Sequence, residues 1–178
     1  MTTTPWGFGL AGALLAGSLF AQAAETPLAR LEADGGKFGW DSITLGMSSV
    51  QVERRTGVTL AMQERSASST EGACMAFSVT VERGTLRLTL GFPSSRPGAK
   101  LQSVYVHFEG YQIAAKREAL VRELKEKVVG ATYQPPKIQP PPAEVDDPAP
   151  SYLLPGGEYA ARLVPGDGLW ITLRECLD

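Results

Sequence analysis

Histidine, cysteine and net charge are all scarce in this chain of 178 residues. It has one His and two Cys, and 17 Lys and Arg nearly balance 19 Asp and Glu, for a formal net charge of −2. So few His and Cys leave little material for a His- or Cys-based metal site. The small net charge argues against a general nucleic-acid binder, which shows a basic face or stripe. The hydrophobic content of 43% excludes a wholly disordered chain, and the length suits one domain.

Long hydrophobic runs are also absent, except for one near the N-terminus. Residues 8–20 form an uncharged apolar run of 13 residues, whereas a membrane-spanning helix needs about 20. The tripeptide Ala-Gln-Ala at 21–23 follows, which is typical of a secretory signal peptide cleaved there or one residue later. Residues 1–7 contain no Lys or Arg, so an uncleaved anchor or a buried helix is the alternative. We expect a signal peptide over 1–23 and a periplasmic or secreted mature protein without a lipid or membrane anchor.

The two cysteines fall in the mature chain, which export places in an oxidising compartment. We therefore expect Cys74 and Cys176 to form one disulfide, closing a loop of 102 residues. The chain-entropy description assigns such a loop about 4–5 kcal/mol, an upper figure because strain usually reduces it. The alternatives are weaker, since a zinc site needs further ligands and a nucleophilic Cys needs a nearby His.

Local signals predict two helices of unequal length. Ser48 with Gln51 three residues later fits a capping box, and Gly57 is a C-terminal stop, which together predict a short helix over 49–56. Apolar residues recur at spacings of three, four and seven over 112–129, which predicts a long amphipathic helix. At that length the second helix can lie across a sheet of several strands.

The other apolar segments alternate with polar residues, as half-buried strands do. Short connections between them indicate an antiparallel meander. We expect an α+β fold, with an antiparallel sheet of about five to seven strands packed by the two helices. The segments are 38–45, 58–62, 74–82, 86–92, 101–108, 159–164 and 169–174.

Composition also predicts the domain organisation. A flexible N-terminal lead over 24–37 is expected before a single domain over 38–178. Within that domain, seven of the 16 residues at 135–150 are proline. Proline fixes φ and lacks an N–H, so this segment is expected to be a polyproline II loop that crosses the surface. A ligand for a proline-binding domain is the alternative.

Catalytic signatures are missing from the sequence. It has no Gly-x-Ser-x-Gly nucleophile motif, no P-loop and no dinucleotide fingerprint. His107 shares strand parity with Tyr105 and is expected to be a solvent-facing strand residue; a role in acid–base chemistry is the alternative for a lone His. The acidic pair at 146–147 lies in the proline-rich loop, whereas glycosidase carboxylates flank a rigid cleft. We expect no enzyme activity, no cofactor and no metal; a cluster of Asp41, Glu109 and His107 around a pocket would indicate an enzyme.

Residues 43–57 read Ile-Thr-Leu-Gly-Met-Ser-Ser-Val-Gln-Val-Glu-Arg-Arg-Thr-Gly. This stretch resembles the start of the SmpA/OmlA (BamE-type) envelope domain and of the related β-lactamase-inhibitor-protein-like fold, which carry an apolar-x-x-Gly-Met-Ser/Thr-x-x-Gln/Glu-Val pattern and a Gly at the helix end. The envelope-assembly protein is a lipoprotein, whereas this chain lacks the anchoring Cys and has extra strands, a long second helix and the proline-rich loop. The resemblance implies a fold and a compartment, with action through protein contact instead of catalysis.

Together these features favour an exported, non-catalytic module that binds another envelope or exported protein. A narrower alternative is an inhibitor or immunity protein against an exported hydrolase or toxin. Another is a periplasmic small-ligand binder with a pocket between the second helix and the sheet. The loops at 65–72 and 93–100 are expected to touch the partner. Interface hot spots favour Trp, Tyr and Arg, which makes the candidate partner contacts Trp40, Arg54, Arg55, Arg65, Tyr111 and Trp170. Ordinary core packing is the alternative for each aromatic residue.

Overall fold

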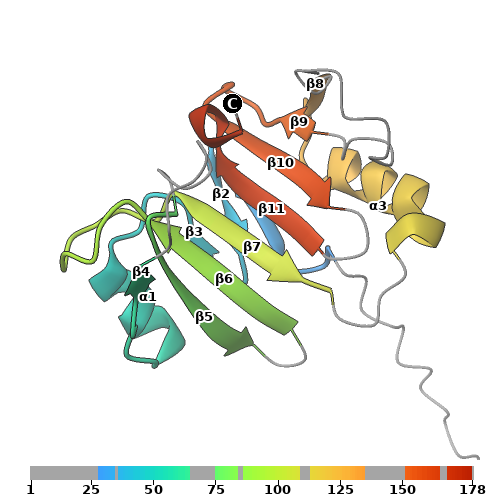
Figure 1. Ribbon diagram of the computed structural model, residues 1–178. Coiled ribbons are helices and arrows are strands. Elements are labelled where there is room, and N and C mark those ends of the chain that lie inside the picture. Colours follow the sequence, from blue (N-terminus) through green and yellow to red (C-terminus); the bar gives the residue numbers. More distant parts are fainter. Residues whose placement is uncertain are drawn as a thin grey trace, which may run out of the picture.

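A computed structural model describes most of the chain beyond the N-terminal segment (Figure 1). The described residues are 28–34, 36–64, 75–83, 86–108, 113–134, 151–164 and 168–177. The predicted signal peptide and the proline-rich loop at 135–150 lie outside them. The elements are β1 (Leu31–Asp34), β2 (Lys37–Trp40), β3 (Ile43–Thr44), α1 (Ser49–Thr56), β4 (Gln63–Glu64), β5 (Phe77–Arg83), β6 (Leu86–Phe92), β7 (Ser103–His107), α3 (Ile113–Lys127), β8 (Thr132–Gln134), β9 (Ser151–Leu153), β10 (Tyr159–Val164), β11 (Gly168–Leu173) and the 3-10 helix η1 (Arg174–Cys176).

The strands form two antiparallel sheets. One has the order β1-β2-β3, and the other has eight strands in the order β4-β5-β6-β7-β11-β10-β9-β8. The described residues are therefore mostly antiparallel sheet with two α-helices, in line with the α+β prediction. The predicted count of strands was too low. Strands β1, β3, β4, β8 and β9 have four residues or fewer, which is too short to show a clear alternation of apolar and polar residues.

Helix α1 begins and ends where the sequence predicts. Ser48 Oγ accepts a hydrogen bond from the Gln51 backbone N–H at 3.3 Å, and Gln51 Oε1 accepts one from the Ser48 N–H at 2.8 Å. Gly57 follows the helix with φ 69°, a left-handed conformation that costs little without a Cβ. Its N–H donates to the Glu53 carbonyl at 2.8 Å. Val52 is fully buried, so the helix packs against the core through one side only.

Helix α3 is the long helix that the apolar spacing predicts. Leu120, Leu124 and Val128 are buried on one side of it and belong to the hydrophobic core. Lys127 Nζ donates a 2.9 Å hydrogen bond to the Ala29 carbonyl, so the end of the helix is tied to the turn before β1.

The described residues 28–34 correct part of the prediction of a flexible lead over 24–37. Leu28 is 0% exposed and Leu31 is 8% exposed, and both belong to the core. β1 pairs with β2 over four positions. Two leucines and a set of backbone hydrogen bonds suffice to order a segment whose overall composition is polar.

A tight turn joins β2 to β3 at the place where the sequence indicated one. Asp41 and Ser42 have φ values of 47° and 68°, unusual for residues other than glycine. Contacts from the β1 side hold the turn: Ser42 N–H donates to the Glu32 carboxylate, and Arg30 Nη1 lies 3.8 Å from Asp41 Oδ2.

The core lies between the large sheet and the small one, which Figure 1 shows behind it. Two ring pairs join the sheets. Phe38 and Tyr159 have centroids 5.6 Å apart, and Trp40 and Phe108 have centroids 6.0 Å apart. The buried strand residues facing this core are Val79, Val81, Leu88, Leu90, Val104, Val106, Ala161, Leu163, Leu169 and Ile171.

One predicted strand does not form. Residues 58–62 alternate apolar and polar side chains but lie outside any strand, and sheet pairing starts only at β4. The backbone N–H of Leu60 instead donates to Glu53 Oε1 at 2.9 Å. A carboxylate from α1 therefore takes a donor that a sheet ladder would otherwise use.

Candidate interaction surface

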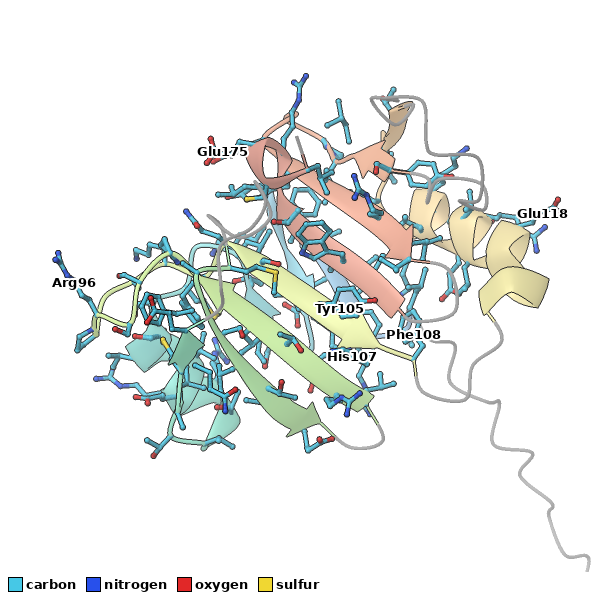
Figure 2. All side chains as sticks on the ribbon, in the orientation of Figure 1. Arg96, Tyr105, His107, Phe108, Glu118 and Glu175 are labelled. Atoms are coloured by element: carbon cyan, nitrogen blue, oxygen red, sulfur yellow. The ribbon has the colours of Figure 1, made fainter. Side chains whose placement is uncertain are left out.

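The large sheet has a second face, which points away from β1–β3; we call it the outer face. In Figure 2, Tyr105 and His107 are labelled near it, and no helix of the described residues crosses in front of it. Strand register aligns one row of side chains across the outer face from β5 to β9. The row is Thr80, Thr89, Tyr105, Trp170, Arg162 and Ser151. The outer face thus carries hydroxyl, aromatic and guanidinium groups, whereas the face of the large sheet toward the core carries apolar residues.

His107 extends this row on β7. Its ring lies 4.6 Å from that of Tyr105, because residues two apart on a strand point to the same side. His107 Nε2 and Thr89 Oγ1 on β6 are hydrogen-bonded at 2.8 Å, and Thr89 Oγ1 is 3.4 Å from Thr80 Oγ1 on β5. The sequence predicted a solvent-facing His107; the structure shows it half-buried in a side-chain network that spans three strands.

Trp170 is the centre of the row and is nearly covered. Its indole N–H donates to Ser103 Oγ on β7, and only 4% of the residue is exposed. Arg162 lies over the indole, with its guanidinium carbon 5.7 Å from the ring centroid. Arg162 Nε also donates to Ser151 Oγ at 3.0 Å. Trp170 and Ser151 therefore fix the guanidinium in one place on the outer face.

Met75, which follows Cys74 in the sequence, and Cys176 belong to the same end of the large sheet. A Cβ built on Gly91 would lie 2.6 Å from Met75 Cγ, so Met75, just before β5, packs against the end of β6. Gln102 links the neighbouring strands there: its N–H donates to the Gly91 carbonyl at 3.0 Å, and its carbonyl accepts from the last residue of β11 at 3.2 Å. Cys176 follows β11 and is fully buried. No cysteine among the described residues is free, and Cys74 lies outside them, so the disulfide stays a prediction.

Two of the predicted partner contacts are corrected by the structure. Trp40 is 1% exposed and packs on Phe108 in the core. Trp170 is 4% exposed beneath Arg162. Burial of a large ring stabilises the fold, so both tryptophans support the structure and neither offers a surface to a partner. Trp40 Nε1 has no hydrogen-bond partner within the described part of the chain.

Of the other predicted contacts, some are exposed in the structure and some lie outside the described residues. Arg54 and Arg55 are exposed in the last turn of α1, and the loop at 93–100 is mostly exposed. Arg65, Tyr111 and the loop at 65–72 lie outside the described residues. Asp41 lies in the turn between β2 and β3 of the small sheet and His107 lies on β7 of the large sheet, so the two are not brought together in one strand network; Glu109 is outside the described residues.

Sequence reasoning missed most of the outer-face network. The alternation in β11 indicates that Trp170 and Leu169 point to different faces of the sheet. The sequence likewise indicates that Tyr105 and His107 share one face. The partners Thr89, Ser103 and Arg162 come from other strands, and no local pattern reveals which strand will be the neighbour.

The described ranges show neither a metal-binding cluster nor a membrane-spanning helix. These ranges contain no group of three or more His, Cys, Asp and Glu side chains that could hold a metal ion. None of the helices in them is both long enough and apolar enough to cross a membrane.

Comparison with known proteins also gave no match. No protein-family model matches the chain, and no curated protein or solved structure is significantly similar to it. The resemblance of residues 43–57 to BamE-type and β-lactamase-inhibitor-like domains therefore stays a hypothesis.

Proposed function

We propose that this chain is an exported, non-catalytic module that binds another envelope or exported protein through its outer face. One observation carries the proposal: Tyr105, His107 and Arg162 lie on a sheet face that no described helix crosses, and neighbouring strands hold them in place. Signal-peptide cleavage near residue 23 and a disulfide between Cys74 and Cys176 belong to the same proposal.

The composition of the outer face suits protein contact. Tyr and Arg are among the residues that most often dominate the energy of protein interfaces, and the outer face carries Tyr105 and Arg162. Arg162 is already oriented by Trp170 and Ser151, so less side-chain entropy is lost when a partner binds. The row also brings hydroxyl groups from Thr80 and Thr89, which donate or accept as a partner requires.

The narrower function, inhibition of an exported hydrolase or toxin, uses the same face and differs only in the identity of the partner. The small-ligand alternative has less support. Leu120 and Leu124 of α3 are buried against the sheet, which is apolar packing where that alternative placed a pocket.

Export and site-specific cross-linking in cells test the proposal. The full chain is produced with a photo-reactive amino acid at Thr80, the exposed residue of the row on β5, and a matched sample carries it at Arg122, which is exposed on α3. We expect a mature N-terminus near Ala24. We also expect one cross-linked exported protein at position 80 that is missing at position 122 and is lost on Arg162→Glu. Retention of the signal peptide, or equal cross-linking at both positions, contradicts the proposal; a co-purified small molecule without any protein would favour the ligand binder.

A further inference from the structure

We propose that the end of the molecule formed by α1 and the loop at 93–100 is a second interaction surface, which binds an acidic surface of a protein partner. We call it the basic end. It consists of Val50, Arg54, Arg55, Val58, Arg96 and Lys100. It shares no residue with the outer face and does not depend on it.

The two segments of the basic end are joined by backbone hydrogen bonds. Ser49 N–H donates to the Ala99 carbonyl at 3.1 Å. Leu101 N–H donates to the Met47 carbonyl at 2.7 Å, and Gly46 N–H donates to the Leu101 carbonyl at 2.8 Å. The loop is therefore held against the start of α1, and Figure 1 shows both at the same end of the molecule. The exposed basic residues of both segments therefore lie at the same end of the molecule, and Figure 2 labels Arg96 on the loop.

The basic end carries cations that the fold does not neutralise. Arg54, Arg55, Arg96 and Lys100 are all exposed. Arg30 pairs with Asp41 at 3.8 Å, but none of these four makes an ion pair in the described part of the chain. The whole chain has a net charge of −2, so with these four set aside the rest has −6. The same end also carries Glu53 of α1 and the exposed Glu64 of β4, so four cations stand against two carboxylates there. A region with a net positive charge on a negative molecule attracts and orients an acidic partner.

Exposed valines add an apolar component. Val50 is 36% exposed and Val58 is 43% exposed, and they are two of the three exposed large hydrophobic residues described. Val50 lies four residues before Arg54 within α1, so the two share one side of the helix. Val58 follows directly after Gly57, which ends the helix. Helices that lie on membranes are longer and present Trp, Phe or Leu, whereas α1 has eight residues and none of these. This chemistry fits carboxylates around a small apolar contact on a protein.

The test uses the protein purified after export and a defined probe. The probe is a short synthetic peptide of glutamates around two leucines, and its counterpart has glutamine in place of glutamate. Binding is followed by the NMR shifts of backbone amides. We expect the glutamate peptide to shift residues 50–58 and 93–100, the glutamine peptide to shift neither, and added salt to weaken binding.

Matched variants locate the site. Arg54→Gln with Arg55→Gln should weaken the peptide roughly three- to tenfold, whereas Arg122→Gln with Arg174→Gln, two exposed arginines elsewhere, should leave it unchanged. If the first pair fails to fold, Arg96→Gln with Lys100→Gln replaces it. Shifts that miss the basic end, or equal weakening by both pairs, overturn the proposal. Binding to phosphatidylglycerol vesicles but not phosphatidylcholine vesicles, with no peptide shifts at the basic end, also overturns it, in favour of a membrane surface. The outer-face residues are read in the same spectra, so failure of one surface is distinguishable from failure of the other.

Discussion

The guanidinium carbon of Arg162 lies 5.7 Å from the ring centroid of Trp170, its direct neighbour on the adjacent strand. Arg162 also donates to Ser151 on the other side, so it bridges β11 and β9 across β10. We expect Arg162→Met, which keeps the apolar stem, to lower the free energy of unfolding by about 1–2 kcal/mol, from the lost cation–π contact and hydrogen bond. Urea denaturation measures this. Arg122→Met on exposed α3 is the control, and equal losses in both variants would contradict a specific role for Arg162.

Because Trp40 is buried, its substitution should change the free energy of unfolding more than substitution of a surface residue would. Trp40→Ala should lower the free energy of unfolding by about 3–5 kcal/mol, because it leaves a cavity beside Phe108. Trp40→Phe should be much milder, since it keeps a ring and removes an indole N–H that has no partner. Denaturant unfolding of both variants checks this. A Trp40→Ala protein as stable as the wild type would show that the side chain is not in the core.

The capping box of α1 predicts different losses of stability for two substitutions of Ser48. Ser48→Ala removes the oxygen that accepts from the Gln51 N–H, and we expect a loss of about 0.5–2 kcal/mol in unfolding free energy. Ser48→Gly should cost only a few tenths, because glycine leaves the N-terminal N–H groups open to water. Thermal unfolding ranks the variants. If Gly destabilises more than Ala, backbone entropy and not the cap dominates at this position.

We expect deprotonation of Tyr159 to lower the free energy of unfolding at alkaline pH. Burial, and secondarily the negative charge of Glu158, raise the pKa of Tyr159 above its usual value of about 10. The folded protein therefore holds this proton more tightly than the unfolded chain, so its contribution is complete below about pH 10 and is lost as the pH rises toward the folded pKa. Unfolding followed across this range should show a steeper decline for the wild type than for Tyr159→Phe, which keeps the packing on Phe38. Parallel curves would contradict the raised pKa.

The predicted disulfide is testable by mass. Intact mass of the exported protein should rise by two hydrogens on reduction, and Cys176→Ala should lower the free energy of unfolding by about 2–5 kcal/mol. Cys74→Ala is the matched variant and should have a similar effect. Two free thiols in the exported protein would rule the pairing out.

Parts of this fold could be predicted from the sequence alone, because they depend on local interactions. The start and end of α1 depend on Ser48, Gln51 and Gly57, which lie within ten positions of one another. The α3 stripe and the alternation in β6 are likewise patterns within one element, and hydrophobic burial enforces them wherever the element packs. Very short strands such as β1 and β4 carry no such pattern, so their number was underestimated.

The outer face was decided only by the tertiary structure. Trp170 and Ser103 are 67 positions apart, and they meet because β11 returns to pair with β7. A tryptophan in an alternating segment suits a core or a binding surface equally well, and only the packing of the small sheet on the large one shows that Trp40 is buried. Sequence thus determined where the chain turns, caps and alternates, because those effects act over a few residues. Strand pairing and layer packing decided which side chains reach a partner, because they join residues that no local interaction connects.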